Sequence, residues 1–152
     1  MKQYVLKREQ MIPLGREEVF AFFEKPENLA SLTPAWLNFK ILTPLPITMD
    51  KGRLIDYTIR VMGITQRWTS LITEFDPPNR FVDEQIKGPY SFWHHTHRFQ
   101  NHGDETMITD EVKYGLPLGI LGDLAHRLFV FGQLNEIFEY RQRKISEVLG
   151  KK

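Results

Sequence analysis

The chain contains no cysteine among its 152 residues. This absence excludes disulfide bonds, thiolate chemistry and zinc sites built from cysteine. The sequence also lacks any apolar run close to the roughly 20 residues that a membrane-spanning helix requires. We therefore expect no integral membrane association. Because no secretory signal is visible in the first residues either, we expect a cytoplasmic protein.

Neither sign of charge predominates, since 20 basic and 19 acidic side chains give a net charge of +1. Proteins that bind nucleic acid usually carry a basic patch or a basic excess, so we expect no nucleic-acid partner. The 41% hydrophobic and 26% charged residues are ordinary for a globular protein. The length favours a single domain over residues 1–152, and the sequence carries no signal for an oligomeric state.

Apolar residues recur at helical spacing near the end of the chain and predict a long helix over Leu121–Leu149. The stripe consists of Leu121, Leu124, Leu128, Phe131, Phe138, Ile145 and Leu149. An amphipathic helix of this length must bury its apolar face against another layer. The residues before the helix are the candidate for this second layer, because apolar and polar side chains alternate there as they do in β-strands.

The rest of the chain predicts one strand, two short helices and then a run of strands. The expected elements before the run are a strand over Gln3–Ile12 and helices over Arg16–Glu24 and Asn28–Leu32. The later strands are expected over Trp36–Thr43, Arg53–Met62, Ile64–Phe75, Arg80–Lys87, Ser91–Gln100 and Glu105–Tyr114. Short turns between most of them indicate antiparallel neighbours. The loops Pro44–Gly52 and Gly115–Gly119 are candidates for the mouth of a pocket.

Several local stretches are similar to those of a known superfamily. They are Val19–Phe23 with Pro26–Leu29, Phe81–Gln85, Gly88–Tyr90 with Trp93–Phe99, and Asp110–Tyr114 with Pro117 and Gly119. With the order of elements, they resemble the START and birch-pollen-allergen superfamily, in its bacterial ligand-binding, polyketide-cyclase-like branch. The resemblance implies an α+β helix-grip fold, in which a curved antiparallel sheet wraps around a long C-terminal helix. It implies no metal ion and no cofactor.

Turn lengths predict which residues stand opposite one another on neighbouring strands. A two-residue turn at Met62–Gly63 pairs Tyr57 with Trp68. A turn at His102–Gly103 pairs His95 with Asp110. The row expected across the inner face of the sheet is Ile72, Asp83, His95 and Asp110.

Buried carboxylates and imidazoles are tolerated only when they are paired or hydrogen-bonded. We therefore interpret the row as a polar patch in an apolar cavity that binds a hydrophobic small molecule, either lipid-like or aromatic. The expected ligand-binding residues are Tyr57, Trp68, Ser70, Asp83, Gln85, Trp93, His95, His97, Phe99, Asp110, Tyr114, Leu128 and Phe131.

Two other functions fit the same residues. In an enzyme of the cyclase or dehydratase type, His95 is the general base, Asp110 or Asp83 orients it, and Tyr57 or Tyr114 donates to the developing enolate. In a protein-interaction module, the aromatic residues simply fill a closed core.

The spacing of His95 and His97 places both imidazoles on one face of a strand, as a metal site requires, with Asp83 or Asp110 as a third ligand. Interior histidines are more often hydrogen-bonded lining than ligands. From the sequence alone we therefore expect no metal ion.

Overall fold

The computed structural model of the chain describes residues 2–61 and 63–150. Within these residues the strands are β1 Tyr4–Ile12, β2 Lys40–Ile41, β3 Leu54–Val61, β4 Ile64–Asp76, β5 Arg80–Lys87, β6 Phe92–His102 and β7 Glu105–Gly115. They form one sheet in the order β1-β7-β6-β5-β4-β3-β2, and every neighbouring pair is antiparallel. The expected strand alternation is confirmed for most of the chain.

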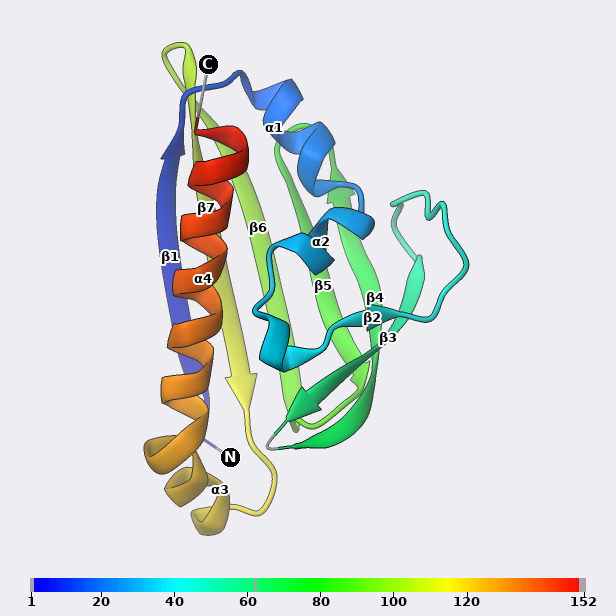
Figure 1. Ribbon diagram of the computed structural model, residues 1–152, viewed down its shortest axis with the longest axis vertical. Helices are drawn as coiled ribbons and strands as arrows, with labels where there is room; N and C mark the ends of the chain where they lie inside the picture. Colours follow the sequence, from blue (N-terminus) through cyan, green and yellow to red (C-terminus); the bar gives the residue numbers. More distant parts are fainter. Residues whose placement is uncertain (1, 62, 151–152) are drawn as a thin grey trace.

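Helices cover one face of the sheet (Figure 1). They are α1 Arg16–Phe23, α2 Glu27–Ser31, the short 3₁₀ helix η1 Ala35–Leu37, α3 Ile120–Ala125, the π-helical turn η2 His126–Val130 and α4 Phe131–Leu149. Figure 1 shows α4 running along the side of the sheet that contains β1 and β7, with α1 and α2 towards the other strands. This arrangement is the helix-grip fold. No helix in the described part of the chain is long and apolar enough to cross a bilayer.

The strand expected over Trp36–Thr43 is much shorter than predicted. Ala35–Leu37 form a 3₁₀ turn, and only Lys40 and Ile41 pair with β3. Asn38, the first of the two residues that separate these elements, has a φ of 49° in the left-handed region. Asparagine tolerates this conformation better than most side chains, so the chain turns there before it can extend.

The expected register is confirmed at Tyr57 and at Asp83 and is wrong at the last hairpin. Tyr57 pairs with Trp68, and Asp83 pairs with His95, as predicted. Met62, one of the two residues expected in the first of these turns, lies outside the described residues. At the last hairpin His102 pairs with Glu105, because the turn is Gly103–Asp104 rather than His102–Gly103, so His97 stands opposite Asp110.

The predicted apolar stripe is only half right. Phe138, Ile145 and Leu149 are buried as expected. The earlier members are largely exposed, namely Leu121, Leu124, Leu128 and Phe131. Each turn of a π-helix takes more residues than an α-helical turn, so η2 rotates the preceding residues relative to those that follow. The residues that face inward before α4 are consequently Gly122 and His126.

The different exposure of the stripe residues predicts that substitutions at its exposed and buried positions change stability by unequal amounts. Leu128, with 62% of its surface exposed, should tolerate Leu128→Ser with a change in unfolding free energy within about 0.5 kcal/mol. Ile145 is fully buried, so Ile145→Ala should destabilise by about 2–5 kcal/mol through lost burial and a new cavity. Urea unfolding followed by circular dichroism measures both changes. A loss above 2 kcal/mol for Leu128→Ser would contradict the exposed position.

Candidate functional site

A cavity of about 170 Å³ lies between the middle of the sheet, α4 and the segment from α2 to β2. Most of its wall is apolar. The expected site residues that line it are Tyr57, Trp68, Ser70, Asp83, Trp93, His95 and His97. They come from β3, β4, β5 and β6, and alternation along each strand directs all of them to the helix side of the sheet.

Three expected site residues lie near the cavity without lining it. Asp110 is buried behind the imidazole of His95. Gln85 is held by the backbone of Tyr90, since its Nε2 donates to the Tyr90 carbonyl at 2.8 Å and its Oε1 accepts from the Tyr90 N–H. Tyr114 is fully buried, and its hydroxyl lies 2.7 Å from Nε2 of His126.

The other three expected residues lie elsewhere. Phe99 packs in the apolar core, with its ring 5.0 Å from that of Phe20 at close to a right angle. Leu128 and Phe131 are exposed by 62% and 52%, so the prediction that they line the pocket is wrong. The residues of α4 that line the cavity are Leu134, Ile137, Phe138 and Arg141. The rotation introduced by η2 accounts for Leu128, whereas Phe131 is exposed at the first position of α4.

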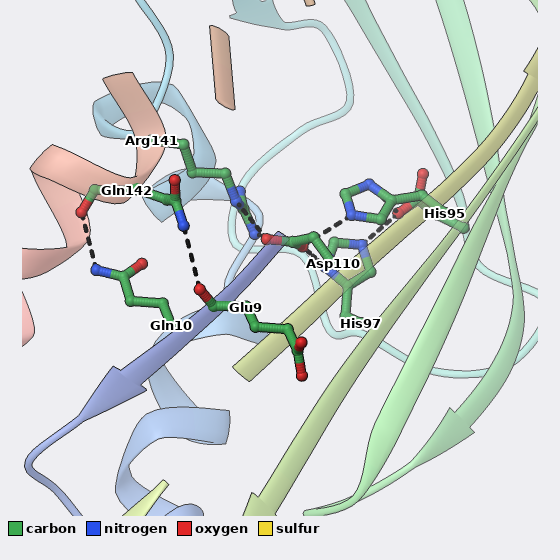
Figure 2. A network of polar contacts seen from close by, with 8 residues as sticks. Glu9, Gln10, His95, His97, Asp110, Arg141 and Gln142 are labelled. Carbon is green, nitrogen blue, oxygen red and sulfur yellow. Dashed lines mark hydrogen bonds and ion pairs between the residues drawn. The ribbon is translucent and has the colours of Figure 1, made fainter. Parts of the chain in front are cut away.

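Asp110 is the centre of a buried polar network (Figure 2). Its Oδ1 lies 2.8 Å from Nε2 of His95. From the opposite side, the guanidinium of Arg141 on α4 donates to both carboxylate oxygens at 3.3 and 3.4 Å. His95, Asp110 and Arg141 are each less than a tenth exposed, so the network is shielded from water. It therefore joins α4 to the sheet through charge as well as packing.

A second carboxylate, Asp83, lies on the cavity side of the same network. Its Oδ2 is 2.7 Å from Nε2 of His97 and 3.8 Å from Nδ1 of His95. The two imidazoles are stacked with centroids 3.7 Å apart. The other nitrogen of His97, Nδ1, lies 3.5 Å from Asp110 Oδ1 but makes no hydrogen bond in the described structure.

Burial and charge act in opposite directions on the two carboxylates. Burial alone would raise the pKa of Asp110, but the Arg141 guanidinium and the hydrogen bond with His95 outweigh it and hold that pKa well below its usual range. The pKa of Asp83 is also lowered, because the hydrogen bond with His97 and the nearby imidazoles outweigh burial. Since an ionised carboxylate only accepts hydrogen bonds, Nε2 of each histidine is the donor.

The imidazole of His97 stays neutral over the physiological range. Its burial, followed by the neighbouring His95, lowers the pKa to about 4 despite the hydrogen bond with Asp83. On β3, burial and then the charge of Asp83 raise the pKa of Tyr57 well above 10. The Tyr57 hydroxyl, 3.4 Å from Ser70 Oγ, therefore keeps its proton.

Sequence reasoning missed Arg141, and a signal for it was present. The predicted stripe jumps from Phe138 to Ile145, and position 141 falls in that gap on the same helix face. A buried row of acids on the sheet needs a cation to offset its charge. Combining these two observations selects Arg141 as the inward-facing partner. His126 was missed as well, and its inward position depends on η2, which no periodicity in the sequence indicates.

The fold and the cavity define a START-like helix-grip protein. The family described as polyketide cyclase/dehydrase and lipid transport matches residues 12–139, and the chain belongs to this family. No curated protein matches the sequence.

Solved structures support the same fold. The Zhui aromatase/cyclase from Streptomyces superposes with a TM-score of 0.76 at 12% identity, covering 98% of this chain and 94% of that one. A START superfamily protein from Mycobacterium smegmatis has a TM-score of 0.69 at 11% identity, with 96% and 97% covered. Norcoclaurine synthase from Thalictrum has a TM-score of 0.66 at 14% identity, with 96% of each chain covered. At these identities the likeness shows the fold alone.

The buried pair of Asp110 and Arg141 predicts a large effect of removing one partner. Arg141→Leu should destabilise the protein by about 3–5 kcal/mol, because it leaves a carboxylate buried without its cation. The double variant Asp110→Asn with Arg141→Leu should recover part of this loss. Denaturant unfolding measures both values. The neighbouring exposed Arg143 provides the matched control, and Arg143→Leu should change stability by less than about 0.5 kcal/mol. Equal effects of Arg141→Leu and Arg143→Leu would contradict the role of the pair.

Proposed function

We propose that the protein binds a small hydrophobic molecule, with one or two rings, in the cavity between the sheet and α4. The observation that supports this most directly is the cavity itself, with its volume of about 170 Å³. Apolar cavities of about 150 Å³ are large enough to bind benzene, so a compact ring system matches this volume. The open space also counts against a closed core of the kind that an interaction module requires.

Aromatic side chains make up one end of the cavity. Trp68 stacks on Tyr57 with centroids 5.7 Å apart and meets Trp93 edge to face at 5.2 Å. Tyr90 lies against Trp93 at 4.9 Å. Rings offer both a flat face and a polarised edge to a bound aromatic group, which favours ring-containing ligands over a flexible acyl chain.

Polar groups at the cavity wall favour a ligand that carries oxygen. The indole Nε1 of Trp68 is buried and has no hydrogen-bond partner among the described residues. A buried donor without a partner is rare in folded proteins and is readily satisfied by an acceptor on a ligand. The hydroxyls of Tyr57 and Ser70 also line the cavity. A phenol or an aromatic ketone has both a ring that can pack against the aromatic lining and an oxygen that can hydrogen-bond with these polar groups.

The cavity predicts that a bulky substitution inside it will block binding. Ile41 is half-buried and lines the cavity, whereas the next residue, Leu42, is exposed. Ile41→Trp should weaken the binding of 2-naphthol at least tenfold, equivalent to about 1.4 kcal/mol, because the indole occupies the ligand's space. Leu42→Trp is the matched control and should bind as the unmodified protein does. Isothermal titration calorimetry with phenols of one to three rings measures the affinities.

Two outcomes would contradict the binding proposal. One is the absence of heat or of a shift in melting temperature with every phenol in the series. The other is equal binding by the Ile41→Trp and Leu42→Trp variants, which would place the ligand outside the cavity. A three-ring phenol that binds as tightly as 2-naphthol would contradict the assigned ligand size.

A second function, a cyclase or dehydratase reaction, is favoured by one specific observation. Asp110 accepts a hydrogen bond from Nε2–H of His95, so the remaining nitrogen, Nδ1, carries the lone pair in the neutral ring. His95 lines the cavity. An imidazole oriented by a buried carboxylate is the arrangement that general-base catalysis uses. Proton removal next to a carbonyl is the first step such a reaction needs.

The enzyme hypothesis predicts catalysed hydrogen exchange. The methyl protons of 4-hydroxyacetophenone should exchange with deuterium oxide faster in the presence of the protein, because His95 removes an α-proton. His95→Gln should reduce the rate roughly a hundredfold. His94→Gln, on the other face of β6, should leave it unchanged. Proton NMR measures the rates, and an exchange rate that is the same with His95→Gln would rule out His95 as the base.

A further inference from the structure

We propose that Asp83, His95 and His97 bind one divalent transition-metal ion, of the class represented by Zn²⁺, at the polar end of the cavity. These residues offer one carboxylate oxygen and two imidazole nitrogens, and the three atoms lie within 4.8 Å of one another. Two imidazoles and one carboxylate are a donor set that Zn²⁺, Co²⁺ and Fe²⁺ accept. The inference does not depend on the proposed ligand.

The spacing of the donor atoms is close to what a metal ion requires. At metal–ligand distances near 2.1 Å, tetrahedral ligands are about 3.4 Å apart. Asp83 Oδ2 lies 2.7 Å from His97 Nε2 and 3.8 Å from His95 Nδ1, one value below this spacing and one above it. Binding requires the imidazole rings, now inclined by 24°, to turn so that both lone pairs meet the ion.

Asp110 already occupies the position of a supporting carboxylate for such a site. Histidines that bind a metal through one nitrogen usually donate the other N–H to a carboxylate or carbonyl, which fixes the tautomer and the ring orientation. Nε2 of His95 lies 2.8 Å from Asp110 Oδ1, which leaves Nδ1 for the ion, and a bound ion excludes the general-base role of that nitrogen. Arg141 holds both oxygens of Asp110 in place.

The unpaired nitrogen of His97 is the independent observation that points to an ion. In the present arrangement Nε2–H of His97 donates to Asp83, so Nδ1 faces Asp110 Oδ1 at 3.5 Å and makes no hydrogen bond. If a metal ion takes Nε2, the proton moves to Nδ1, which can then donate to Asp110. Metal binding with this change of tautomer thus gives every nitrogen of both imidazoles a partner, whereas the buried Nδ1 of His97 now lacks one.

The balance of charge also favours a cation. Around the two imidazoles the network holds two carboxylates, Asp83 and Asp110, against one guanidinium, Arg141. A divalent ion offsets this excess of negative charge in a buried location. Since Asp83, His95 and His97 all line the cavity, the remaining coordination position would be accessible from it.

Metal binding to the chain without any affinity tag tests the proposal. After treatment with a chelator, Zn²⁺ should bind with a stoichiometry of one by isothermal titration calorimetry. Asp83→Asn and His97→Gln should each weaken binding by at least about tenfold, and Asp110→Asn by roughly 10–100-fold through loss of the supporting carboxylate. His94→Gln and His102→Gln remove histidines outside the site and should bind as the unmodified protein does. Circular dichroism shows whether each variant is folded.

Cobalt gives a readout that needs no variant. Co²⁺ bound to two imidazoles and a carboxylate in a four- or five-coordinate site should give visible absorption far stronger than that of the hydrated ion. The absence of stoichiometric Zn²⁺ binding would overturn the proposal, and so would a Co²⁺ spectrum like that of the hydrated ion. Binding that survives both Asp83→Asn and His97→Gln would also overturn it, since the ion would then lie elsewhere.

Proton NMR distinguishes a bound metal ion from the main alternative explanation. In that alternative, His97 Nδ1 already carries a proton that it shares with Asp110. With Zn²⁺ bound, the Nδ1–H signal of His97 should appear only after the metal is added. A signal already present in the chelator-treated protein would assign the unpaired nitrogen to a proton and overturn the metal site. The phenol-binding measurements on the Ile41→Trp and Leu42→Trp variants contain no metal, so the two proposals fail independently.

Discussion

The buried carboxylate of Asp110 is the constraint on which the arrangement of helix and sheet depends. An apolar helix face can slide or rotate over an apolar sheet at small cost, because dispersion and burial carry little direction. A hydrogen-bonded ion pair has direction, and a carboxylate buried without its partner is strongly destabilising. The contact between Asp110 on β7 and Arg141 on α4 therefore sets which face of α4 meets the sheet, while the same carboxylate orients His95 on β6.

The cavity lies next to this network. α4 approaches the side of the sheet formed by β1 and β7, and the curved remainder of the sheet is covered by shorter segments, α2 and η1 (Figure 1). Apolar side chains from these segments fill much of the space. They do not fill the region beside Asp83, His95 and His97, whose polar atoms need polar partners. A site with an apolar wall and a small polar end is the usual form of a small-molecule pocket, and it is also where a metal ion would meet a bound ligand.

Much of the candidate site could be predicted because strand geometry is local. Side chains two residues apart share a face, so His95 and His97 had to point the same way, and the turns placed Asp83 beside them. The error at the last hairpin moved the expected partner of Asp110 from His97 to His95, yet a shift of two residues preserves the face. The contact of His95 with Asp110 therefore exists, across the strands and on a diagonal.

The amino-acid sequence by itself determined the order of the elements, the turns between strands and the side of the sheet on which each polar residue lies. These features follow from alternation and from turn residues that act over a few positions. Only the tertiary structure decided the rotation of the C-terminal helix and the π-helical turn that exposes Leu128 and turns His126 inward. Those outcomes depend on contacts between residues far apart in the chain, and helical periodicity carries no information about which partner a helix face will meet.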